Sequence, residues 1–148
     1  MKDKSWRDIV LDDPSTWPSR HKIELPRAHV DERGKIQPLV DFPMKNVSLI
    51  FSKRGSVRSN HYHKTDWHYM YVLSGSFEYH FRRAGSSAEP ERMILRVGEL
   101  IFTPPHEEHA TVFLEDTEIV VASRNVRDQT VYEHDVKRVV LVEPRQLA

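Results

Sequence analysis

Histidine is the residue type in this chain that is most able to do chemistry. Four of the nine histidines lie between His61 and His80. His61 and His63 are two residues apart, and in a β-strand residues at this spacing point to the same face. If His68 and His109 each open a later strand, they add to this pair. Three or four neutral imidazoles suit Zn, Fe, Ni, Mn or Cu.

A different role for these histidines is to line a protein interior, bonded to one another or to water. The sequence therefore leaves two interpretations of His61, His63, His68 and His109. In the first they bind one divalent transition metal ion, and in the second they are structural. We favour the metal site, because the spacing places the imidazoles of His61 and His63 on one face.

Short strands separated by turn residues are expected to position these side chains. Tyr69–Leu73 is an apolar run that ends at Ser74-Gly75, and residues 77–81 alternate between aromatic and polar side chains with a period of two. No segment keeps a 3.6-residue period over three turns, so the pattern favours a β-sandwich or barrel. The expected strands cover residues 35–36, 47–52, 69–73, 77–81, 93–95, 100–102, 110–113, 118–122 and 139–142.

Bulk properties exclude several classes of protein. Lys plus Arg equals Asp plus Glu at 22 each, so no basic excess supports general nucleic-acid binding. The absence of cysteine excludes disulfides, thiolate metal sites and a cysteine nucleophile. No apolar run approaches the ~18 residues of a membrane-spanning helix. The N-terminus shows no signal peptide, so we expect a cytoplasmic protein.

The length of 148 residues fits one domain. We expect an N-terminal arm over residues 1–33 and a barrel domain over residues 34–148, with its first strand at Lys35-Ile36. The arm is polar, with Trp6 and Trp17 as apolar anchors and a helical turn near Lys4, and it either packs on the barrel or is frayed.

Two segments resemble the motifs of the cupin family. Gly55-x5-His61-x-His63-x4-His68-x6-Gly75 is similar to the first cupin motif, G-x5-H-x-H-x3,4-E-x6-G. Gly98-x5-Pro104-x-His106-x2-His109 is similar to the second, G-x5-P-x-G-x2-H-x3-N. The resemblance covers about residues 34–125 and implies an all-β jelly-roll barrel with a metal site.

The sequence departs from the cupin motifs at three positions. His68 replaces the glutamate, His106 replaces the second glycine, and Phe113 replaces the asparagine. Without a carboxylate the ligand set is neutral, or it consists of three histidines with His68 behind them. A metal ion bound in this way keeps its full charge and is a stronger Lewis acid, but hard ions such as Mn²⁺ bind less well.

The segment from Asn46 to Lys64 also resembles deoxythymidine-diphosphate sugar epimerases and ketoisomerases. The resemblance implies that Arg58 approaches nucleotide phosphates and that His61 is the catalytic base. Those enzymes need no metal and lack the third histidine, which is His109 here. We therefore expect a metal-dependent isomerase or epimerase acting on a carbohydrate or nucleotide sugar.

In this mechanism the metal stabilises an enolate as a Lewis acid while a nearby base moves a proton. The candidate bases are His106, Tyr79 and Tyr71, and the candidate substrate-binding residues are Arg58, Trp67 and Tyr62. We expect Glu107 and Glu108 to be solvated loop charges, or alternatively to orient the histidine ligands.

Two other functions fit the same residues. Several histidines around iron can activate O2, which would make the protein an oxygenase. The same pocket could also bind a small molecule without turnover. The cupin resemblance further implies a homodimer, with Trp6, Ile9 and Val10 of the arm as candidate contacts.

Overall fold

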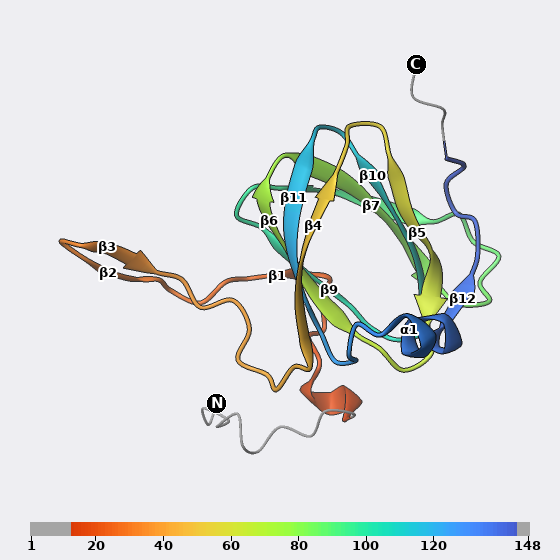
Figure 1. Ribbon diagram of the computed structural model, residues 1–148, viewed down its shortest axis with the longest axis horizontal. Coiled ribbons are helices and arrows are strands. Elements are labelled where there is room, and N and C mark those ends of the chain that lie inside the picture. Colours follow the sequence, from red (N-terminus) through yellow and green to blue (C-terminus); the bar gives the residue numbers. More distant parts are fainter. Residues whose placement is uncertain (1–12, 145–148) are drawn as a thin grey trace.

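The computed structural model describes residues 13–144. Two five-stranded antiparallel sheets face each other and form a barrel (Figure 1). The strand order is β1-β9-β6-β11-β4 in the first sheet and β12-β5-β10-β7-β8 in the second. This architecture confirms the all-β jelly-roll prediction.

Each of the two sheets combines strands that are far apart in the sequence. The first sheet contains β1 (Lys22–Ile23), β4 (Asn46–Ser52), β6 (His68–Ser74), β9 (Leu100–Thr103) and β11 (Thr117–Ser123). The second contains β5 (Val57–His63), β7 (Ser76–Arg83), β8 (Glu91–Arg96), β10 (Glu107–Phe113) and β12 (Val136–Arg138). The remaining elements are a 3-10 turn (Pro14–Thr16), the hairpin strands β2 (His29–Asp31) and β3 (Gly34–Ile36), and helix α1 (Gln129–Asp135).

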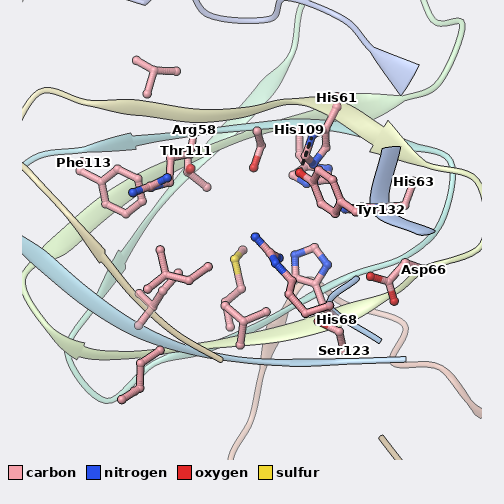
Figure 2. A pocket seen from close by; sticks show the side chains of 18 of the residues that line it. Arg58, His61, His63, Asp66, His68, His109, Thr111, Phe113, Ser123 and Tyr132 are labelled. Atoms are coloured by element: carbon pink, nitrogen blue, oxygen red, sulfur yellow. Dashed lines mark hydrogen bonds between the residues drawn. The ribbon is translucent and has the colours of Figure 1, made fainter. Parts of the chain in front are cut away.

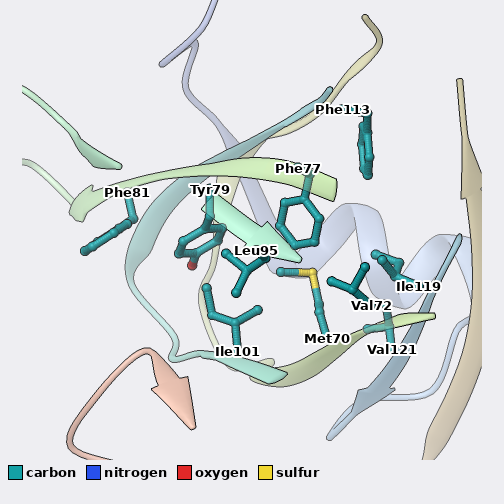
Figure 3. Packing of buried hydrophobic residues seen from close by; sticks show 10 residues of the cluster. All are labelled: Met70, Val72, Phe77, Tyr79, Phe81, Leu95, Ile101, Phe113, Ile119 and Val121. Atoms are coloured by element: carbon teal, nitrogen blue, oxygen red, sulfur yellow. The ribbon is translucent and has the colours of Figure 1, made fainter. Parts of the chain in front are cut away.

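An apolar cluster fills part of the space between the sheets (Figure 3). Phe77 and Tyr79 of β7 and Leu95 of β8 are fully buried at its centre. Each buried side chain of this size contributes about 1.5–3 kcal/mol relative to its exposed state. The other members are Met70, Val72, Phe81, Ile101, Phe113, Ile119 and Val121.

A second apolar cluster lies on the outer face of the first sheet and attaches the N-terminal segment. It is built on Trp67, Tyr69, Leu100 and Phe102. The Trp17 ring lies 6.3 Å from the Trp67 ring, and β1 pairs with β9. Residues 17–25 of the expected arm therefore pack on the barrel. Lys4, Trp6, Ile9 and Val10, which carried the other expectations for the arm, lie outside the described residues.

Two strand predictions were wrong. Lys35 and Ile36 do not open the barrel, because β3 pairs with β2 in a hairpin that projects away from it (Figure 1). Residues 139–142 form no strand. Asn60 explains this, since its carbonyl groups accept the N–H groups of Val139, Leu141 and Val142 at 2.9, 2.9 and 3.1 Å. The segment thus satisfies backbone groups without a ladder.

Helix α1 lies at one end of the barrel, beside β5 and β12 (Figure 1). Asp128 caps it by accepting the Val131 N–H at 3.0 Å. Seven residues are too few to display a helical period, so the sequence pattern did not predict this helix. Neither α1 nor the 3-10 turn has the length and hydrophobicity of a bilayer-spanning helix, and residues 13–144 contain no longer helix.

Candidate metal centre

Strands β5 and β10 bring three of the predicted ligands together. His61 and His63 share the inner face of β5, and His109 of β10 is the direct ladder partner of His61. One nitrogen from each imidazole lies within 4.8 Å of the other two. Such proximity is what binding to a single ion requires.

His68 approaches the same place from the other sheet. Figure 2 shows its ring on the wall facing His61 and His109. Its centroid lies 5.6 Å from that of His63 and 5.7 Å from that of His109. His68 does not belong to the tight three-histidine group and lies across the cavity from it.

The three grouped imidazoles are each held by their Nδ1 atom. His109 Nδ1 donates to the Glu107 carbonyl oxygen at 2.8 Å, and His63 Nδ1 lies 3.1 Å from an Asp135 carboxylate oxygen. His61 Nδ1 lies 3.4 Å from the Tyr132 hydroxyl. Hydrogen bonds of this kind orient metal-binding histidines and leave Nε2 for the ion.

Burial favours the neutral form of His61 and of His109, which is the form that binds a metal ion. Burial, together with His109 and His63, lowers the pKa of His61 to about 2. Burial and His63 lower the pKa of His109 to about 3, and burial holds the pKa of His68 well below its usual range. His109 Nε2 is buried without a hydrogen-bond partner, an arrangement that a metal ion would satisfy.

Asp135 organises the loop that follows β5. It accepts hydrogen bonds from the Thr65 N–H and hydroxyl at 2.7 and 2.6 Å and from the Asp66 N–H at 3.2 Å, in addition to His63. Burial alone would raise its pKa, but the bonds from His63 and Thr65 hold the pKa below the usual range. His63, Asp66 and Asp135 also form a possible cation group, although hydrogen bonds already occupy the Asp135 oxygens.

The four histidines line a cavity of about 520 Å³ between the two sheets. Three arginines also line it: Arg58, Arg127 and Arg138. Among the described lining residues Asp66 is the single carboxylate. Figure 2 shows the histidines at one end and Arg58 with Phe113 at the other.

Residues 49–123, which carry both histidine motifs, match the family described as Cupin domain. The chain is a cupin. No curated protein sequence matches this cupin at a significant level.

Solved structures similar to this cupin include sugar-nucleotide enzymes. A 3,4-ketoisomerase from Helicobacter canadensis is 19% identical with a TM-score of 0.62, over 76% of this chain and 85% of the other. A variant of the QdtA 3,4-ketoisomerase from Thermoanaerobacterium thermosaccharolyticum, in complex with TDP-4-keto-6-deoxyglucose, is 20% identical with a TM-score of 0.60, over 76% and 82%. The 3'-monoepimerase ChmJ from Streptomyces bikiniensis, in complex with dTDP-quinovose, is 20% identical with a TM-score of 0.60, over 72% and 65%. At these identities the likeness concerns the fold.

None of the three expected bases lines the cavity of the cupin. Tyr79 is buried in the apolar cluster, where its hydroxyl bonds Thr103 at 2.8 Å and Glu107 at 2.6 Å. Tyr71 points to the outer face of the first sheet and packs on the second apolar cluster. His106 is exposed in the turn before β10, with φ 58°. This left-handed conformation explains why glycine occupies the position in the cupin motif.

The expected substrate-binding residues divide between the cavity and the outside. Arg58 lines the cavity, and two of its N–H groups bond Ser52 Oγ at 2.7 Å and the Phe51 carbonyl at 3.0 Å. These bonds cross from β5 to β4 and connect the two sheets. Trp67 is buried in the outer cluster, and Tyr62 lies beside His106 with 5.9 Å between rings. Strand alternation explains the Tyr62 result, because its neighbours His61 and His63 point inward.

Glu107 and Glu108 are buried, so the expectation of solvated loop charges was wrong. Glu107 bonds His21 and Tyr79, and Glu108 pairs with Arg82 Nε at 2.5 Å. Both residues lie within β10, and their side chains gain partners that compensate for desolvation.

Sequence reasoning missed five residues of the site: Asp66, Arg127, Tyr132, Asp135 and Arg138. Asp66 lies inside the first cupin motif, where its place between His63 and His68 was an available signal. The other four follow residue 123, beyond both motifs. No local pattern indicates that α1 and β12 return to the mouth of the cavity.

Proposed function

We propose that this cupin is a metal-dependent isomerase or epimerase that acts on a carbohydrate or nucleotide-sugar substrate. The observation that carries the proposal is the convergence of His61, His63 and His109, each held through Nδ1, in a cavity of about 520 Å³. A structural histidine cluster would be expected to satisfy all of its buried nitrogens, whereas His109 Nε2 has no partner.

His61, His63 and His109 would hold the ion, with His68 as the nearest further imidazole. A divalent ion bound there would act as a Lewis acid that stabilises negative charge on a substrate oxygen. The donors are neutral imidazoles, which favour Zn, Fe or Ni over Mn.

We assign proton transfer to Asp66, in place of the tyrosines and His106 considered from the sequence. Its carboxylate lines the cavity and accepts the Asn125 N–H at 2.9 Å. Burial raises its pKa, and the bond from Asn125 only partly offsets this. A buried carboxylate with a raised pKa can remove a proton next to a carbonyl group and return it to the other face or the neighbouring carbon.

The carbohydrate class rests on similarity of fold and on Arg58. Ketoisomerases and epimerases of sugar nucleotides share the barrel at TM-scores near 0.6. Arg58 keeps N–H groups beyond the two that bond β4, and an arginine with free donors can bind a phosphate.

Two measurements test the proposal. The first is metal content of the untagged protein and of a double variant, His61→Ala with His109→Ala. We expect a stoichiometric divalent metal in the wild type and in His134→Ala, an exposed control, and its loss in the double variant. Metal content unchanged by the double substitution would refute the site.

The second measurement is solvent deuterium exchange into TDP-4-keto-6-deoxyglucose, followed by NMR. We expect exchange next to the keto group, lost in Asp66→Asn and in the metal-free protein. Exchange that survives removal of the metal would overturn metal dependence. A metal-loaded protein without exchange on this and related keto sugars would favour a binding module.

We further propose that the protein is a homodimer, with a second copy covering the outer face of β4. Val47, Leu49 and Phe51 alternate along this edge strand and are 68%, 68% and 54% exposed. The projecting hairpin adds Val30 and Ile36, which are 69% and 66% exposed. An apolar edge strand is a natural pairing site.

A further inference from the structure

Two arginines at the α1 and β12 side of the cavity have no role in the reaction outlined above. Arg127 precedes α1, and Arg138 ends β12; we refer to them as the arginine pair. Both line the cavity together with the three grouped histidines. The two guanidinium groups therefore place positive charge next to the candidate metal centre.

Arg138 is placed beside the metal ligands by the sheet. It is the direct ladder partner of His61 in the pairing of β12 with β5. Residues directly opposite each other in an antiparallel ladder project to the same face. The Arg138 side chain therefore shares the cavity side of the sheet with His61.

Arg127 reaches the same neighbourhood through Tyr132. Its guanidinium carbon lies 5.0 Å from the centre of the Tyr132 ring, a cation–π distance. The hydroxyl of this ring is the Nδ1 partner of His61. The Tyr132 ring therefore lies between the Arg127 guanidinium group and His61 of the candidate metal centre.

Neither cation is neutralised inside the cavity. Ion pairs among the described residues include none for Arg127. Arg138 pairs with Glu133 at 3.0 Å, but the two side chains are 63% and 46% exposed, and pairs of this kind contribute little. Asp66 is the single carboxylate among the described lining residues, against three arginines. A divalent ion on neutral imidazoles would add further positive charge.

We propose that the ligand of this cavity carries an oxyanion, a carboxylate or a phosphate, that binds between the arginine pair and the candidate metal centre. The inference rests on the proposed function and names the chemistry of its substrate at that position. An anionic oxygen suits an ion without an anionic protein ligand, and guanidinium groups bind carboxylate and phosphate through two parallel hydrogen bonds.

The proposed oxyanion site between the arginine pair and the candidate metal centre is separate from the phosphate site proposed for Arg58. Arg58 lies at the other end of the cavity, beside Phe113, and is tied to β4 (Figure 2). The arginine pair instead belongs to the segment after residue 123, outside the residues that match the cupin family. A substrate that fills the cavity would present an anionic group to the arginine pair whether or not it places phosphates near Arg58.

The test is calorimetric titration with three probes that share a hexose ring: D-glucuronate, glucose 1-phosphate and neutral D-glucose. We expect at least one anion to bind about 10-fold or more tightly than glucose. Double substitution of the arginine pair, Arg127→Gln with Arg138→Gln, should abolish this preference. Arg92→Gln, an exposed arginine on β8, should retain it. The double variant Arg127→Lys with Arg138→Lys, which keeps both charges without the planar guanidinium groups, should retain part of the preference.

Each result decides a separate point. Preference for glucuronate identifies a carboxylate, and preference for glucose 1-phosphate identifies a phosphate. Equal binding of all three probes, or a preference that survives the double substitution, overturns the oxyanion site. Metal content is measured on the same samples, and the titration is repeated on metal-free protein. Absence of metal alone would refute the proposed function while the arginine pair is still tested.

Discussion

The interior of this barrel has two ends with opposite chemistry, built on the same faces of the same strands. In β6 the inward positions run from His68 through Met70 to Val72, and in β10 from His109 through Thr111 to Phe113. Strand alternation decides which residues point inward, but position along the strand decides whether they do chemistry or form the core. The same barrel can therefore carry a reactive end without losing its apolar packing.

The apolar end should control stability and leave metal binding intact. Phe77 is fully buried in the apolar cluster, so Phe77→Ala should lower the free energy of unfolding by about 3–5 kcal/mol. Urea unfolding at pH 7.5 measures this loss. The variant should retain wild-type metal per folded molecule, and loss of metal would mean that the two ends are not separable.

Acid should destabilise the protein through the histidine end of the barrel. Well above pH 6.5, His61 and His109 are neutral in both the folded and the unfolded state and do not change the free energy of unfolding. Below pH 6.5, His61 and His109 bind protons in the unfolded chain. In the folded protein they stay neutral, because their pKa values are about 2 and about 3. Stability of the metal-free protein should therefore fall as the pH drops, by about 2 kcal/mol for each imidazole at pH 5.

Unfolding in urea between pH 7.5 and pH 4.5 measures this slope. The variant His61→Leu with His109→Leu should have a shallower slope than the wild type, while Phe77→Ala should keep it. An equal slope in all three proteins would show that groups elsewhere dominate acid unfolding.

Helix α1 should affect the affinity for the metal ion more than the stability of the fold. Asp135 and Tyr132 hold the Nδ1 atoms of His63 and His61. Asp135→Asn and Tyr132→Phe should each weaken metal affinity by about 10–100-fold, measured by competition with a chelator. Glu133→Gln, on the exposed side of the same helix, should leave affinity unchanged. If all three variants bind metal equally, α1 does not orient the ligands.

The two ends also differ in how far the sequence predicts them. Spacing within one strand predicts the shared face of His61 and His63, and the motif glycines and prolines predict where the strands stop. Gly75 is such a case, since a Cβ there would lie 2.3 Å from Thr117 Oγ1. These features are local, so period and turn chemistry suffice.

Contacts between distant segments escape such reasoning. Tyr79 was one of the candidate bases, but Thr103 and Glu107 satisfy its hydroxyl within the core. Asp135 meets His63 across 72 positions of sequence. Neither contact leaves a pattern in the sequence, because both depend on how the completed barrel places α1 and β9.

Substitutions on the outer face of β4 should have almost no effect on the stability of the folded monomer. Leu49 and Phe51 are exposed, so substituting either with lysine should change the stability of one subunit by no more than about 0.5 kcal/mol. If a second copy covers this face, the double variant Leu49→Lys with Phe51→Lys should be a monomer in light scattering while the wild type is a dimer. Val97→Lys, an exposed turn position, serves as the control and should remain dimeric. A monomeric wild type would overturn the homodimer, and the two-ended interior would then be complete within one chain.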